Sequence, residues 1–156
     1  MYVLVLFSGF EPLFFKCIMV NYFSENITFE LKDTSPITAW LERISSQYNE
    51  HIEELNYIFC SDDHLLEMNK AHLKHDFYTD ILTFCYQSTP IMGDIYISID
   101  RVKDNANTFK VSFEEELYRV IVHGLLHILG FDDHSEEDKI EMRAMESASL
   151  ELLNLP

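Results

Sequence analysis

The sequence has few of the residues on which several protein classes depend. Its 156 residues include three cysteines, four prolines and four glycines. Cys17, Cys60 and Cys85 are odd in number, widely spaced and part of no Cys-x-x-Cys pattern, so we expect neither a disulfide framework nor a cysteine zinc site. The scarcity of proline and glycine argues against long flexible linkers and favours one globular domain in a reducing cytoplasm.

Basic residues are also scarce. Lysine and arginine number 11 against 27 acidic residues, which gives a formal net charge of −16. An acidic chain of this kind lacks the broad basic face with which proteins bind nucleic acid regardless of sequence, so DNA is not expected as a partner. RNA stays possible, because a bound metal cation or a small basic patch can hold a phosphate locally.

Long hydrophobic runs are missing even at the apolar N-terminus. Glu11 and Lys16 interrupt the first 20 residues, and the longest apolar run is too short to span a bilayer. No membrane partner is therefore expected. We interpret residues 1–18 as a doubtful N-terminal extension and residues 19–156 as a single domain, with Met19 as the favoured start of the functional chain.

Hydrophobic periodicity predicts short strands and longer helices along the domain. Strands are expected at 19–23, 27–31, 55–60, 80–86 and 94–99, the first two as a possible hairpin, and helices from 35, over 62–72, 100–109 and 112–129, and from 135. This order predicts an α+β fold: a single domain with a small mixed β-sheet packed by helices.

The clearest predicted helix covers residues 112–129. Ser112 and Glu115 have the spacing of a capping box at its start. The helix is apolar on nearly every side, which is typical of a buried helix. Gly130 suits a left-handed residue at its end.

Two histidines on this buried helix indicate a metal site. His123 and His127 are four residues apart, so they project from the same face, one turn apart. Burying two imidazoles is costly unless their nitrogens find partners, and a metal ion would satisfy one nitrogen of each. The chain that turns back at Gly130 offers Asp133 or His134 as a third ligand.

The stretch also differs from a zinc protease. Such proteases carry the motif HExxH, in which the glutamate acts as a general base, and here that position is Gly124. Peptide hydrolysis by that mechanism is therefore disfavoured. Three protein ligands would still leave one coordination position open for water, as in catalytic zinc sites.

The stretch HGLLHILGFDDH (residues 123–134) resembles the HGxLHLxGYDH motif of the YbeY family of metal-dependent endoribonucleases. MNKAHLKHDFYTDILTF (residues 68–84) is similar to the family's LNxxYRxKDxPTDVLSF segment, and GDIYIS (residues 93–98) is similar to its GDIxIS strand. Order and spacing agree from about residue 19 to the end.

The resemblance implies an α+β domain with one zinc ion that hydrolyses single-stranded RNA. It also implies roles in ribosomal RNA maturation and ribosome quality control, with ribosomal small-subunit components as partners. Two alternatives stay open: a ribosome-associated binding factor with a structural zinc and weak or no nuclease activity, or another metal-dependent hydrolase.

Two departures from the family pattern concern the site. The family's third metal ligand is a histidine ten residues after the first, and gapless pairing places Asp133 there and His134 one residue later. We prefer Asp133, because a carboxylate oxygen is a legitimate zinc ligand. The family's active-site arginine is Leu73 here, so Lys74, His75 and Arg119 are candidates for substrate binding. The general acid or base is not assigned; His134 is a candidate if it is not a ligand, and Asp132 is a candidate for orienting a ligating histidine.

Overall fold

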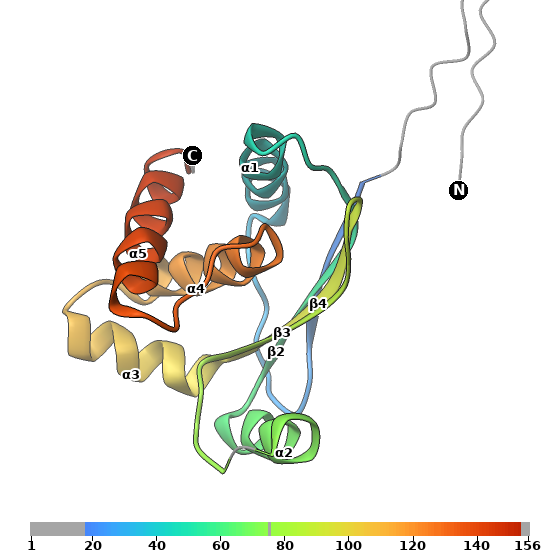
Figure 1. The fold of residues 1–156 in the computed structure, drawn as a ribbon. Helices are drawn as coiled ribbons and strands as arrows, with labels where there is room; N and C mark the ends of the chain where they lie inside the picture. Colours follow the sequence, from blue (N-terminus) through green and yellow to red (C-terminus); the bar gives the residue numbers. More distant parts are fainter. Residues whose placement is uncertain (1–17, 75, 154–156) are drawn as a thin grey trace, which may run out of the picture.

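A four-stranded mixed sheet forms the centre of the computed structural model, which describes residues 18–74 and 76–153 (Figure 1). The strand order is β1-β2-β4-β3; β1, β2 and β4 run parallel, and β3 is antiparallel to β4. The elements in chain order are β1 (Met19–Ser24), α1 (Thr34–Gln47), β2 (Ile52–Cys60), α2 (Asp62–Leu73), β3 (Ile81–Ser88), β4 (Ile91–Ser98), α3 (Ile99–Phe109), α4 (Phe113–Ile128) and α5 (Glu136–Glu151). The predicted α+β class is confirmed.

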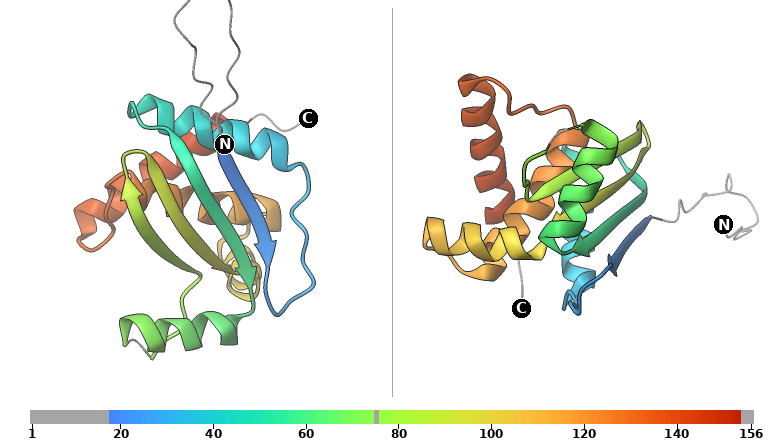
Figure 2. Two further views of the ribbon diagram at one scale, coloured as in Figure 1. Left: turned by 90° about the vertical axis from the view of Figure 1, so that its right-hand side faces the viewer. Right: turned by 90° about the horizontal axis from the view of Figure 1, so that it is seen from below.

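The two faces of the sheet have different surroundings. Helices α1, α3, α4 and α5 lie on one side of it, whereas α2 lies across the end at which the parallel strands finish (Figures 1 and 2). The opposite face carries a polar row across three strands. Asn21 donates to Asn56 at 2.8 Å, and Asn56 donates to Asp94 at 2.9 Å. Alternation along the strands thus separates an apolar, helix-covered face from a polar one.

One sequence prediction about the sheet is wrong. Residues 27–31 form no strand, and β1 is not part of a hairpin, because it pairs in parallel with β2 after the crossover through α1. Phe29 instead packs edge-on against Phe59 and Phe113, and its carbonyl accepts a hydrogen bond from Ser24. Side-chain packing, rather than strand pairing, therefore explains the apolar pattern of this segment.

Helix α4 is buried between the sheet and the other helices. Gly124 lets it approach the sheet closely, because a Cβ atom there would lie 2.9 Å from side-chain atoms of Ile81 and Ile95. The hydroxyl of the fully buried Tyr57 donates to the carbonyl of Ile121 at 3.1 Å and ties β2 to the helix. On the far side, the Trp40 indole donates to the Ser149 carbonyl at 2.7 Å and ties α1 to α5. The contacts of Gly124 and Tyr57 thus fix α4 against the sheet, and the Trp40 bond joins two helices that pack around it.

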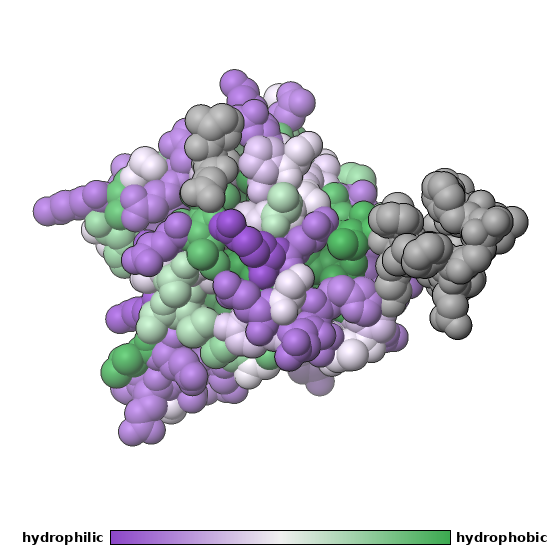
Figure 3. Space-filling view, turned by 90° about the horizontal axis from the view of Figure 1, so that it is seen from above, coloured by the Kyte–Doolittle hydropathy of each residue, from purple (hydrophilic) through white to green (hydrophobic). Residues whose placement is uncertain are grey.

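The surface viewed from above is largely hydrophilic, with small hydrophobic areas between polar side chains (Figure 3). This mixture agrees with the strongly acidic composition. Within the part of the chain that the structure describes, no helix has both the length and the apolar content needed to cross a membrane.

Candidate metal centre

The two histidines of α4 face one another. The Nε2 atoms of His123 and His127 are 2.9 Å apart, as their spacing of four residues on one helix requires. The helix begins at Ser112, whose hydroxyl accepts a hydrogen bond from the Glu115 amide. Gly130, with a φ of 100°, then reverses the chain after the helix end.

The reversed chain brings Asp133 to the histidines. The Phe131 amide donates to the Leu126 carbonyl at 3.0 Å and closes the turn. Asp133 Oδ2 then lies 3.8 Å from the Nε2 atom of His123 and 3.8 Å from that of His127. Two imidazole nitrogens and one carboxylate oxygen, one from each residue, thus lie close enough together to hold a metal ion.

The outer nitrogen of each histidine is held by a group that accepts a hydrogen bond. His127 Nδ1 lies 3.0 Å from the Phe131 carbonyl, and His123 Nδ1 lies 2.7 Å from Glu146 Oε1. Because a carbonyl and an ionised carboxylate only accept, each Nδ1 carries the proton, and the Nε2 of a neutral ring keeps its lone pair. Two lone pairs and a carboxylate facing one point are complementary to a cation, so these residues fit a metal ion.

The electrostatic surroundings shift the pKa values of His123 and His127 in opposite directions. Burial alone would lower the pKa of His123, but the hydrogen bond and charge of Glu146 outweigh burial and raise it. The pKa of His127 is lowered by burial and by the neighbouring His123. The two rings are therefore not equivalent, and the carboxylate of Glu146 accounts for the difference.

Arg119, a predicted substrate-binding residue, is surrounded by carboxylates. Its guanidinium lies 3.5 Å from Glu115 Oε1, 3.6 Å from Glu116 Oε2 and 3.5 Å from Glu146 Oε2. Glu116 is 2% exposed, and burial raises its pKa. Arg119 therefore offsets part of the negative charge of Glu116 and Glu146 and, through Glu146, is linked to His123.

The remaining predicted site residues lie apart from the histidines. The side chain of His134 is 86% exposed, and its Nε2 lies 3.4 Å from Asp132 Oδ1. Asp132, Asp133 and His134 form a second, more exposed group with metal-ligand atoms. Lys74 ends α2 in a left-handed conformation with an exposed side chain, and His75 lies outside the described residues.

Cavities flank the histidines on both sides. One, of about 530 Å³, lies between the segment before β3, β3 itself and the end of α4; Asn69, Thr79, His127 and Asp133 contribute to its wall. The other, of about 460 Å³, lies between α3, α4 and α5 and includes His123. A chain-like substrate could thus extend to either side of the cluster.

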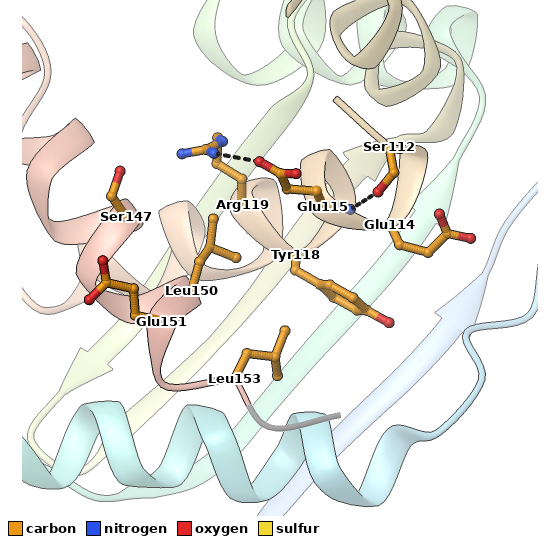
Figure 4. Close-up of a pocket in the computed structure, with 9 residues that line it drawn as sticks. All are labelled: Ser112, Glu114, Glu115, Tyr118, Arg119, Ser147, Leu150, Glu151 and Leu153. Carbon is orange, nitrogen blue, oxygen red and sulfur yellow. Dashed lines mark hydrogen bonds and ion pairs between the residues drawn. The ribbon is translucent and has the colours of Figure 1, made fainter. Parts of the chain in front are cut away.

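A third cavity, of about 580 Å³, contains none of the three clustered residues. It lies between the start of α4 and the end of α5; Tyr118 and Arg119 line it from α4, and Leu150 and Glu151 line it from α5 (Figure 4). Arg119 lies beside Glu115. Cavity volume alone therefore does not single out the histidine and aspartate group.

Glu146 is the functional residue that sequence reasoning missed. It lies on α5, 23 residues after His123, and no local spacing connects the two. One signal was present, because Glu146 follows Met142 by four residues and precedes Ser149 by three, and these three residues form the buried face of α5. A carboxylate at a core-facing position demands a buried partner.

The fold and the three clustered residues define a small α+β protein with a histidine and aspartate group able to hold a metal ion. Residues 21–154 match the family described as Endoribonuclease YbeY. Curated proteins with that name include one from Cytophaga hutchinsonii, 48% identical over 85% of this chain and 94% of its own, and one from Flavobacterium psychrophilum, 44% identical over 85% and 96%. The chain therefore belongs to the YbeY family.

A solved structure has the same fold. The solution structure of a protein from Thermotoga maritima aligns with a TM-score of 0.59 and 28% identity, covering 86% of this chain and 89% of the other. The alignment covers most of both chains, so the two proteins share an architecture.

Proposed function

We propose that this protein is an endoribonuclease that hydrolyses single-stranded RNA with one zinc ion held by His123, His127 and Asp133. The observation that carries the proposal is the convergence of three donor atoms between two cavities. Membership of the YbeY family supports the nuclease activity, since relatives that this chain matches over nearly their whole length carry the name endoribonuclease.

The donor set favours zinc. Two imidazole nitrogens and one carboxylate oxygen are ligands that catalytic zinc sites use, and they leave a fourth position for water or substrate. Among the described residues, the group that contains both histidines offers three donors, one from each of His123, His127 and Asp133. A structural zinc site would be closed by a fourth protein ligand, so the open position favours catalysis over a purely structural role.

Each residue has a distinct part in the proposed reaction. When bound, the zinc ion supplies a Lewis acid that polarises a phosphoryl oxygen and makes a water molecule more acidic. His123 and His127 present their Nε2 atoms, and Asp133 adds a negative charge that improves the affinity for a cation. Glu146 holds the His123 ring in the orientation that exposes Nε2. The cavities on either side accommodate the nucleotides that flank the cleaved bond.

The proposal accounts for the acidity of the chain. A protein with a net charge of −16 repels RNA at long range. The ion would supply positive charge at the one point where a phosphate must approach. We therefore expect weak general affinity for RNA and binding concentrated at the cluster, which suits an enzyme that acts on selected single-stranded segments.

The substrate and place of action follow from the resemblance rather than from geometry. We propose ribosomal RNA as the substrate, small-subunit components as partners, maturation and quality control of ribosomes as the process, and the cytoplasm as the compartment. The binding factor with a structural zinc is the rival, and the replacement of the family arginine by Leu73 is the feature that favours it.

Metal removal tests the proposal. The protein is expected to cleave a single-stranded RNA oligonucleotide, to lose this activity on chelation, and to regain it when zinc is added. His127→Ala should lower cleavage by about a thousandfold, because one ligand and the orientation of the ion are lost. His64→Ala, a histidine of α2 outside the cluster, is the control and should keep full activity. Cleavage that persists in fully metal-free protein would refute the mechanism.

A further inference from the structure

The cavity between α3, α4 and α5 shares a wall with the proposed metal site. His123 and Glu146 line it, so a ligand in this cavity would lie directly beside the cluster. Its volume of about 460 Å³ is large enough for a nucleotide. The part of the wall that α3 contributes plays no role in the metal site itself.

Arg143 is the cation of this wall that is free to bind a ligand. Both Arg119 and Arg143 line the cavity, but the guanidinium of Arg119 is engaged by carboxylates. Arg143 lies on α5 with an exposed side chain. Its charge helps to lower the pKa of Glu136, which lies earlier on α5, but among the described residues no carboxylate lies within ion-pair distance of its guanidinium. An exposed guanidinium next to a cavity is suited to bidentate binding of a phosphate.

The wall from α3 carries groups suited to a nucleobase. Phe109 is 61% exposed, although it is a large aromatic residue, and aromatic rings of this kind stack on bases. Asn105 Nδ2 donates to Asp80 Oδ2 at 2.9 Å, which fixes the two side chains relative to one another. This bond leaves the Oδ1 atoms of Asn105 and Asp80 as acceptors on the cavity wall.

We propose that this cavity is a subsite for one nucleotide of the RNA, adjacent to the bond that is cleaved. Arg143 binds the phosphate, Phe109 stacks on the base, and the Oδ1 atoms of Asn105 and Asp80 accept hydrogen bonds from its amino group. The subsite rests on the proposed nuclease function and deepens it. In this sequence Leu73 replaces the family arginine, and the proposed subsite offers a different guanidinium, that of Arg143, to the substrate.

The charged side chains of the cavity wall determine where the phosphate and the base of the nucleotide bind. Glu116 and Glu146 are both directed at Arg119, so the guanidinium offsets part of their charge within the protein. The carboxyl group of Asp80 lies beside Asn105, where its oxygens accept hydrogen bonds and do not attract a phosphate. The phosphate therefore lies at Arg143. An exocyclic amino group has two hydrogens to donate to the two Oδ1 atoms, whereas uracil has only its N3–H, so adenine, guanine and cytosine are preferred over uracil.

A binding experiment tests the subsite without requiring cleavage. Adenosine 5′-monophosphate and uridine 5′-monophosphate are titrated into ¹⁵N-labelled protein, and the side-chain amide of Asn105 is followed by NMR. The adenosine nucleotide is expected to shift this signal and to bind about fivefold more tightly than the uridine nucleotide, the effect of one hydrogen bond. Arg143→Ala should weaken the binding about tenfold, because a charge-assisted bond is lost. An unshifted Asn105 signal at saturating nucleotide would overturn the subsite.

A kinetic experiment on RNA separates the subsite from the cleavage reaction. Arg143→Ala and Phe109→Ala should each raise KM about tenfold and change kcat by less than about twofold, because the two side chains bind the flanking nucleotide and touch none of the reacting atoms. Lys103→Ala, which removes an exposed positive charge from α3 outside the cavity, should leave both constants unchanged.

The outcomes are distinct for the two proposals. Absence of cleavage by the wild-type protein with zinc would contradict the nuclease function, whatever the nucleotides do. Wild-type cleavage with an unchanged KM in Arg143→Ala would contradict the subsite alone. Equal losses in Arg143→Ala and Lys103→Ala would also contradict it, because they would reveal a general charge effect.

Discussion

Both halves of α4 carry partly buried polar side chains, but the charges in the two halves are balanced in different ways. In the N-terminal half, Arg119 lies within 3.6 Å of a buried Glu116 carboxylate and 3.5 Å of Glu146. In the C-terminal half, His123 and His127 direct lone pairs at one another across 2.9 Å, with Asp133 beside them. The first group contains a guanidinium, which balances part of its carboxylate charge, whereas the second group contains neither an arginine nor a lysine. This difference, rather than polarity itself, distinguishes the group that we propose to bind the metal.

The largest expected effect concerns the residue that completes the C-terminal group. Asp133→Ala should lower the affinity for zinc by about a hundredfold, because a charged ligand is lost. His134→Ala, its exposed neighbour, should change the affinity by less than about threefold. Competition with a zinc-binding dye measures both affinities. The reverse result would assign the third ligand to His134 and contradict the arrangement proposed for the cluster.

A smaller effect on zinc affinity is expected at Glu146, which contacts Arg119 in one half and His123 in the other. Glu146→Gln keeps a hydrogen-bond acceptor for His123 but removes its charge, so the zinc affinity should fall about tenfold. Glu141→Gln, on the exposed side of α5, provides the matched control and should bind zinc as the wild type does. Circular dichroism would verify that both variants fold. Equal affinities in the two variants would show that Glu146 has no part in holding the ligand.

The smallest effect on metal binding is expected in the N-terminal half. Arg119→Met should change the zinc affinity by less than about threefold, but it should lower the free energy of unfolding by about 2 kcal/mol, because Glu116 keeps a buried charge without a partner. Denaturant unfolding of Arg119→Met and of the exposed control Lys110→Met measures the difference. If Arg119→Met lost zinc and kept its stability, the distinction between the two halves would fail.

The sequence was most informative where the signal is local. The spacing of His123 and His127 and the position of Gly130 follow from helix geometry, and the structure places all three as the helical pattern requires. The α+β class also follows from the order of periodic segments. These inferences need no knowledge of which elements pack together.

Features that depend on distant segments could not be predicted. The contact of Glu146 with His123 joins two helices, and its geometry depends on the angle between α4 and α5. Arg119 looked like a cation available to substrate, although its carboxylate neighbours include Glu146 from another helix. The segment 27–31 has the composition of a strand, but the sheet offers it no neighbour.

The close approach of α4 to the sheet has a consequence for how this protein could change over evolutionary time. Gly124 occupies the position at which a zinc protease has its glutamate, and a Cβ atom there would lie 2.9 Å from side-chain atoms of Ile81 and Ile95. A glutamate at this position would therefore require the two isoleucine side chains to shift, and its carboxylate would enter an apolar contact between helix and sheet. A single mutation to the HExxH motif would thus disturb the packing that supports the two histidines. The same histidine spacing serves two chemistries, and the packing of one glycine opposes a direct change from one to the other.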